Sequence, residues 1–168
     1  LGTPTLTRIV RGIEGIGHVT RLRLHTRVPT TLPSRLADPA LIALLCAWRG
    51  GLVVVMHANH PAEICAQTVR AVSRLRGAGA LVLNQSVLLA GVNDHADVLV
   101  SLSEALFDAG VMPYYLHLLD PVDGAAHFEV DAARVHALKT ALENHLPGYL
   151  VPTLVREDPG AAAKTRLA

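Results

Sequence analysis

Short apolar runs alternate with longer helical patterns along the chain. The run at 19–26 alternates polar and apolar residues, whereas the run at 52–56 is continuously apolar and mostly β-branched, which is typical of a strand buried on both faces. Each run is followed by a segment with helical spacing, and this order indicates βα units and a parallel sheet. The strands predicted in this way cover residues 19–26, 52–56, 80–86 and 112–120.

Capping and breaking residues mark the expected helices. Asp38 followed by Pro39 is typical of a helix start, with the aspartate as N-cap. An extended segment at 149–155 follows the last helix, and the small and polar residues after it are expected to fray in the absence of a ligand. The expected helices cover residues 39–48, 61–76, 95–109 and 130–145.

Polar residues gather where the predicted strands end. Four strands, each followed by a helix, indicate either part of a βα barrel or an open doubly wound sheet, and barrels place their chemistry at the carboxyl ends of the strands. No glycine-rich phosphate loop follows any strand, which disfavours the Rossmann alternative. The polar strand ends are His25, His57–His60, Asn84–Ser86 and His117–Asp120.

Composition restricts the class of protein. Of the 168 residues, 51% are hydrophobic and 17% charged, which excludes a disordered chain and favours one compact core. The net charge of +1, without a basic run, disfavours a nucleic-acid partner.

No apolar run approaches the roughly 20 residues of a membrane helix, and the N-terminus has no signal-peptide layout. We therefore expect a soluble protein, and two cysteines without CxxC spacing, Cys46 and Cys65, fit a reducing cytoplasm. Because the chain begins with Leu1 instead of Met, we also expect a processed or cropped product of a longer protein.

Two histidines and an amide at strand ends are candidate ligand-binding groups. His57 and His60 are three residues apart, so either both imidazoles bind one metal ion, as in a metal-dependent barrel hydrolase, or one faces the site and the other caps the following helix. The amide of Gln85 both donates and accepts, which suits a nucleoside or ribose, and its alternative is a buried amide paired with backbone.

A carboxylate and an amine are the other candidates. Asp120 ends a strand, where an isolated carboxylate is costly unless it meets a cation, so it either binds a ligand ammonium or caps the turn at 121–124. Lys164 follows the small residues at 160–163, which allow a bulky ligand to approach the backbone. A lysine is the residue that forms a Schiff base with an aldehyde cofactor, and its alternative is an exposed lysine of the tail.

Six motifs occur in an order that resembles one family. They lie at 26–29 with 32–35, 57–64, 84–94, 112–120, 124–128 and 148–152. In this order they resemble the C-terminal part of a lysine 2,3-aminomutase, a radical S-adenosylmethionine enzyme that also uses pyridoxal phosphate. The resemblance implies an α/β fold in which the predicted strands are the last four of a six-stranded partial TIM-like barrel. It also implies a barrel part at 1–148 and a C-terminal segment at 149–168 that carries the pyridoxal phosphate lysine.

Within that family the chain looks most like the short branch, which makes β-lysine for attachment to translation elongation factor P. The stretch 107–117 and the end shortly after Lys164 carry this resemblance, whereas 159–163 departs from the glycine run of the free-lysine enzymes. The implied partners are lysine, elongation factor P and its β-lysine ligase. The alternatives are a free-lysine 2,3-aminomutase of amino-acid metabolism and an inactive, truncated barrel remnant.

The resemblance also implies roles for particular residues. Lys164 matches the pyridoxal phosphate lysine, Asp120 and Glu157 match carboxylates that bind the distal ammonium of lysine, and Gln85, with His57 as a weaker candidate, matches a contact of S-adenosylmethionine. The CxxxCxxC motif that binds the family's [4Fe–4S] cluster is missing. Cys46 and Cys65 do not replace it, so no metal ligand is assigned and the isolated chain is expected to be inactive.

Overall fold

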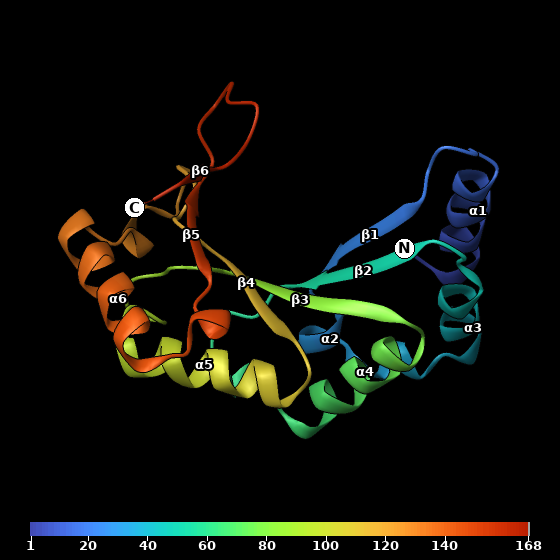
Figure 1. Cartoon of the computed structure of the whole chain (residues 1–168), viewed down its shortest axis with the longest axis horizontal. Coiled ribbons are helices and arrows are strands. Elements are labelled where there is room, and N and C mark those ends of the chain that lie inside the picture. The colour runs from blue at the N-terminus through green and yellow to red at the C-terminus, as the bar shows by residue number, and fades with distance from the viewer. Residues whose placement is uncertain (168) are drawn as a thin grey trace.

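A six-stranded sheet with its strands in chain order forms the centre of the molecule (Figure 1). The structure is a computed structural model and describes residues 1–167. Neighbouring strands run parallel from β1 to β5, and β6 pairs antiparallel with β5. The strands are β1 (Arg21–Thr26), β2 (Gly51–Met56), β3 (Ala80–Val87), β4 (Met112–His117), β5 (Thr153–Arg156) and β6 (Thr165–Arg166).

The four strands predicted from the sequence are confirmed, and the expected extended segment contains β5. Fraying was expected after it, but Thr165 and Arg166 pair with β5 as β6. The 149–168 segment thus adds strands to the same sheet as the rest of the chain.

Helices cover one face of this sheet and flank its ends (Figure 1). They are α1 (Thr3–Glu14), α2 (Val28–Thr31), α3 (Pro39–Ala47), α4 (Ala66–Gly77), α5 (Ala96–Asp108) and α6 (Ala132–His145), with short 3₁₀ turns η1 (Pro33–Ala37), η2 (Pro61–Glu63), η3 (Ala126–Phe128) and η4 (Gly148–Leu150). The opposite face, which we call the open face, carries no helix from residues 1–167 (Figure 1). The expected α/β class, with parallel βα units in an unclosed, partial barrel, is confirmed.

Two helix starts show how local sequence sets the boundaries. The predicted N-cap is confirmed, because Asp38 accepts a hydrogen bond from the backbone N–H of Ala40 at 2.9 Å. The helix expected from Pro61 is wrong at its start: residues 61–63 form η2, and α4 begins at Ala66. The reason is a capping box in which His60 and Glu63 cap each other's backbone, so the turn closes on itself before the helix begins.

The helix α1 was not predicted from the sequence. Its apolar residues Leu6, Val10 and Ile13 have helical spacing, and Val10 is 1% exposed in the core. This signal was available in the sequence. None of the helices built from residues 1–167 has the length and apolar character that crossing a bilayer requires.

The core lies between the sheet and its helices, in two clusters. The first joins the inner side chains of β1 to β3 with α1, α3, α4 and part of α5, and the second joins β4 and β5 with the rest of α5 and with α6. Leu52, Val54 and Met56 belong to the first cluster, and Leu116 and Leu154 to the second. Because side chains alternate across a strand, the residues between these face the open side.

Candidate functional site

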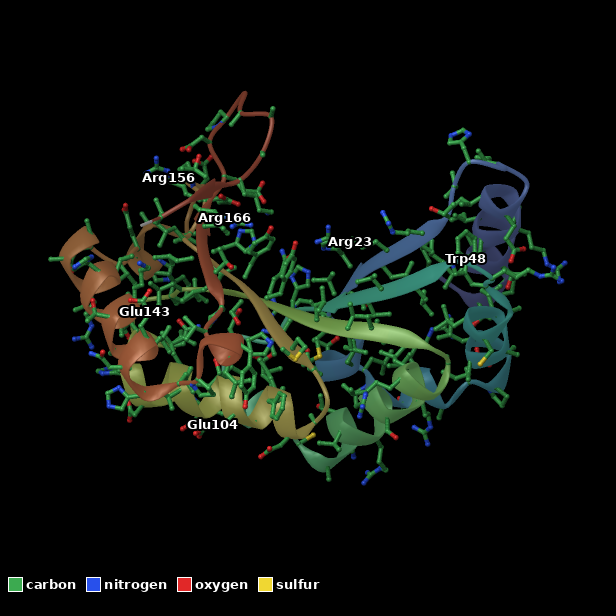
Figure 2. All side chains as sticks on the ribbon, viewed as in Figure 1. Arg23, Trp48, Glu104, Glu143, Arg156 and Arg166 are labelled. Carbon is green, nitrogen blue, oxygen red and sulfur yellow. The ribbon has the colours of Figure 1, made fainter. Side chains whose placement is uncertain are left out.

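The carboxyl ends of the parallel strands place polar side chains on the open face. Leu116 packs in the core, so its neighbours Tyr115 and His117 point the other way. The strand register sets Gln85 of β3 beside Tyr115 of β4. Arg23 of β1 projects to the same side of the sheet (Figure 2), where its guanidinium lies 5.8 Å from the ring centroid of Tyr114. The gathering of polar groups expected at the strand ends is therefore observed.

A buried amide fixes the loop after β2. The side chain of Asn84, on the helix-covered face of β3, accepts a hydrogen bond from the N–H of Ala58 at 2.9 Å and donates to its carbonyl at 3.0 Å. The hydroxyl of Ser86 donates to the same carbonyl at 2.8 Å. Ala58 is fully buried, and these contacts satisfy its backbone groups. They hold the neighbouring His57 at the edge of the open face.

A second pair of amides connects the loops after β2 and β3. Asn93, fully buried, donates to the carbonyl of Asn59 at 2.8 Å and to that of Val87 at 2.9 Å. Asn59 in turn accepts from the N–H of Val87 at 2.9 Å. The sequence pattern alone predicts no role for either amide. Asn59 belongs to the polar end of the second predicted strand, whereas Asn93 lies in the turn after β3, where no sequence signal marks it as a buried bridging amide.

The two histidines of this loop have different roles. His60 caps η2, since its Nδ1 accepts from the N–H of Ala62 at 3.2 Å, and Glu63 accepts from the backbone N–H groups of Asn59 and His60 at 2.6 and 3.0 Å. His57 instead lies beside His25 with ring centroids 5.9 Å apart. The expected histidine cap is therefore observed at His60, although it caps the turn η2 and not the helix α4.

Two buried polar atoms face this site without a partner. Within residues 1–167, neither Nε2 of His57 nor Oε1 of Gln85 has a hydrogen bond. The alternative that Gln85 pairs fully with backbone does not hold in the described part of the chain, because its acceptor is unpaired. An unpaired buried polar atom costs about 1–3 kcal/mol, so these positions favour a ligand that supplies the missing partner.

A hairpin brings Lys164 to the same site. The antiparallel register pairs Arg156 with Thr165, and the next positions out are Glu157 and Lys164, which therefore face each other across the hairpin. The ammonium of Lys164 donates to Glu157. It also lies 3.5 Å from Nε2 of His117 and 5.6 Å from the ring centroid of Tyr115. The structure thus joins two predicted site residues, Lys164 and Glu157, with His117, which had been noted only as a strand end.

Electrostatics at this cluster follow from burial and charge. Burial lowers the pKa of His117, and the nearby charge of Lys164 lowers it further, while Glu157 and Asp120 act in the opposite direction. The hydrogen bond from Lys164 lowers the pKa of Glu157. Burial also lowers the pKa of His57, with smaller contributions from the neighbouring His25 and Arg27. The site therefore combines neutral imidazoles with one carboxylate and one ammonium near neutral pH.

Asp120 lies at the edge of the site. Its residue is exposed, in the loop after β4, and its charge reaches His117. Together with Arg156 it lines a cavity of about 870 Å³ between this loop and α6. No hydrogen bond or ion pair involves Asp120 in the described part of the chain. The turn cap that was its alternative role is therefore not formed among these residues.

The cysteines lie outside the site. Cys46 is in α3 and Cys65 is the N-cap of α4; both are free and exposed. Among residues 1–167, no group of three or more His, Cys, Asp or Glu side chains is placed to hold a metal ion. The thiolates that an iron–sulfur cluster needs are not available from these two residues.

Solved structures define the class of fold. Two structures of SuiB from Streptococcus suis, one of them with S-adenosylmethionine bound, align with 94% of this chain and 44% of theirs at TM-scores of 0.52 and 0.53. Sequence identity is 9%, so the likeness concerns the fold alone. The chain therefore has the fold of one part of SuiB, which agrees with the expected partial barrel.

Sequence relatives are more specific, although no protein-family model matches the chain. The chain is 44% identical over 163 residues to the L-lysine 2,3-aminomutase of Haemophilus influenzae and 46% identical over 155 residues to that of Escherichia coli. It is 37% identical over 161 residues to the L-lysine 2,3-aminomutase of Clostridium subterminale. These alignments cover 92–97% of the chain, and the chain spans 38–48% of the relatives. The predicted resemblance to lysine 2,3-aminomutases is confirmed, for about half of their length.

Proposed function

We propose that this chain forms the part of a lysine 2,3-aminomutase that binds pyridoxal phosphate, S-adenosylmethionine and the side chain of lysine, in an enzyme that converts lysine to β-lysine. The observation that carries the proposal is the position of Lys164. The β5–β6 hairpin places its amine beside Glu157 and His117, where the parallel strands end. Enzymes with βα architecture place their chemistry at this end of the strands.

The residues present fit pyridoxal phosphate. The Lys164 side chain is 28% exposed, so its amine is sheltered and still reachable from the open face. Its amine would hold the aldehyde carbon of the cofactor, and Tyr115 provides an aromatic ring 5.6 Å from that amine. When bound, pyridoxal phosphate stabilises the unpaired electron while the nitrogen of the substrate migrates. The task of the chain is to orient the cofactor and exclude water.

The residues also fit the adenosyl part of S-adenosylmethionine. Oε1 of Gln85 needs a donor, and ribose hydroxyls and an adenine amine are donors. Nε2 of His57 is similarly unpaired within the described residues. S-adenosylmethionine supplies the carbon radical that removes hydrogen from the substrate. Gln85 and His57 would orient it on the open face.

The iron–sulfur cluster does not fit this chain, because the two cysteines cannot supply three converging thiolates. We derive no step through the cluster from these residues. The 168-residue chain by itself is expected to lack aminomutase activity.

Lysine recognition is proposed to use Glu157 and Asp120. Glu157 already binds an ammonium group, that of Lys164, which supports the ability of this carboxylate to hold an amine at this position. Asp120 is free of polar partners among the described residues and lies close enough for its charge to act on His117. Two carboxylates on one distal ammonium would select an amino acid by its charge and its length.

The shorter branch, which makes β-lysine for elongation factor P, is the more specific proposal. Identity is higher to the Haemophilus influenzae and Escherichia coli relatives, at 44% and 46%, than to the Clostridium subterminale enzyme at 37%. The chain also spans 45–48% of the first two and 38% of the third, so the first two are shorter proteins. A free-lysine aminomutase is the alternative within the same chemistry.

The test of the proposal uses the fact that the chain has only two lysines, Lys139 and Lys164. The chain is incubated with pyridoxal phosphate, reduced with borohydride, digested and analysed by mass spectrometry. We expect the cofactor on the peptide that contains Lys164, loss of this adduct in Lys164→Ala, and its retention in the matched variant Lys139→Ala. An adduct distributed equally over both lysines would contradict the proposal, because Lys164 would then have no special affinity for the cofactor.

A further inference from the structure

His117 lies at the proposed site but has no chemical role in the proposed function. It is the last residue of β4, is 6% exposed, and lies between an amine and a carboxylate. Its Nε2 is 3.5 Å from Nζ of Lys164, and its Nδ1 is 3.9 Å from Oε1 of Glu157. A base beside a nucleophile, with a carboxylate on its other side, is the arrangement in which side-chain nucleophiles are activated.

The surroundings of His117 keep its imidazole neutral near pH 7. Its pKa is lowered from the ordinary value of 6.5, first by burial and then by the charge of Lys164. A neutral imidazole has one nitrogen free to accept a proton. The charged and titratable groups that act on it from the surrounding elements are Lys164 before β6, Glu157 after β5, Asp120 after β4 and His57 after β2.

We propose that His117 is the base that removes a proton from Lys164 and so prepares its amine to attack an aldehyde. The inference rests on the proposed function in one respect, since an aldehyde cofactor is what gives this amine its task. The distances on which the inference rests are those among this chain's own side chains, His117, Lys164 and Glu157.

The proton balance of this step is complete. The N–H bond of the Lys164 ammonium breaks, the proton moves to Nε2 of His117, and the electron pair remains on the amine. The amine attacks the carbonyl carbon of the aldehyde, forming a carbon–nitrogen bond. As the second carbon–nitrogen bond forms, the carbonyl oxygen leaves as water, having taken up one proton from the amine and one from His117. Lys164 ends as a protonated carbon–nitrogen double bond, and His117 returns to its neutral form.

Glu157 is less suited to be this base. The hydrogen bond from Lys164 lowers its pKa, so its carboxylate favours the ammonium form of the lysine and accepts a proton poorly. A general base is most effective when its pKa lies near the working pH, which an imidazole satisfies better than a carboxylate. Glu157 would instead stabilise the imidazolium of His117 through the contact with Nδ1.

Lys139 provides an internal control. It lies on α6 and forms an ion pair with Glu143 at 3.2 Å. Among residues 1–167, no histidine makes a hydrogen bond to its amine. It therefore has a carboxylate partner, as Lys164 has, but lacks the imidazole contact.

The experiment is reductive methylation of the 168-residue chain with formaldehyde and cyanoborohydride in dilute solution, at pH values spanning about 5 to 8, where an imidazole titrates. Initial rates at Lys164 and Lys139 are read separately by mass spectrometry of their peptides. We expect the plot of methylation rate against pH for Lys164 to show an additional increase below pH 6.5, where His117 loses its proton. The plot for Lys139 should lack this increase, which we call the His117 step. His117→Gln should remove the step and slow Lys164 about tenfold or more at pH 7, with Lys139 unchanged.

A second variant tests the direction of the effect. Glu157→Gln removes the charge that raises the pKa of His117, so the step should move to lower pH. Wild-type profiles with the same shape at both lysines would overturn the inference without any variant. So would a His117→Gln profile at Lys164 that matches the wild type. Either result would contradict the role of His117 without contradicting the proposed function. Failure of pyridoxal phosphate to label Lys164 selectively would contradict the proposed function, and the methylation experiment would still test the role of His117.

Discussion

Asn84 and Gln85 are consecutive residues of β3, yet they lie on opposite faces of the sheet and differ completely in their hydrogen bonding. Asn84, on the helix-covered face, is 2% exposed and bonds both backbone groups of Ala58 as well as Ser86. Gln85, on the open face, buries an oxygen that has no partner within residues 1–167. One face of the sheet is therefore built for stability, and the other leaves polar atoms available to bind a ligand.

The sharpest test of this contrast replaces each amide in turn. Asn84→Ala should lower the free energy of unfolding by about 3 kcal/mol, because the buried N–H of Ala58 loses its acceptor and the carbonyl loses one of two donors. Gln85→Ala, the matched change one residue along, should alter it by less than about 1 kcal/mol. Urea denaturation of both variants measures the difference. Equal losses would show that the two faces are equally structural.

Ligand recognition should show the reverse sensitivity. Glu157→Gln and Asp120→Asn should each weaken lysine binding to the pyridoxal phosphate-loaded chain by about ten- to a hundredfold, equivalent to roughly 1.5–3 kcal/mol for a charge-assisted contact. Titration with lysine, followed by cofactor absorption, gives the affinity. Asp123→Asn, in the exposed turn nearby, is the control and should bind lysine as the wild type does. Unchanged binding in Asp120→Asn would contradict the proposal that this carboxylate holds the substrate ammonium.

Part of the open face is apolar. Leu81 on β3 is 53% exposed, and on the described chain the outer edge of β1 has no strand beside it. Exposed apolar surface and an unpaired edge both favour association, so we expect the chain to self-associate as its concentration rises. Leu81→Lys should reduce this association in sedimentation velocity experiments without loss of stability. The adjacent change Val82→Lys, at a position 2% exposed, should instead unfold the protein. A chain that stays monomeric at every concentration would contradict this prediction.

The smallest effect expected is a dependence of stability on pH. The pKa values of His25, His57 and His117 are all lowered by burial from the ordinary 6.5, so below that pH the unfolded chain binds more protons than the folded one. Stability should therefore decrease as the pH falls from 6.5, down to the lowered pKa values. Melting temperatures of the wild type and of His57→Gln test this, and the variant should show the shallower decrease. A melting temperature that rises on acidification through this range would contradict the assignment of neutral histidines.

The fold was largely predictable because its signals are local. Runs such as 52–56 and the Asp38–Pro39 helix start specify strands and helices through nearby residues alone, and both are confirmed. The short antiparallel β6 was missed because its partner is set by the hairpin register and not by its own two residues. The site was partly predictable for the same reason. Strand ends identified His57 and Gln85, whereas the contact of His117 with Lys164 joins residues 47 positions apart in the sequence.

The hairpin register has a consequence for how the loop between Glu157 and Lys164 can vary in length. The two residues face each other because they follow directly on the pairing of Arg156 with Thr165. Side chains of a strand alternate with a period of two, so one residue inserted at 158–163 that shifts this pairing turns Lys164 to the opposite face, whereas two inserted residues return it to the site. Insertions that shift this pairing should therefore come in even numbers wherever the lysine is retained, and odd ones should require a bulge that restores the phase.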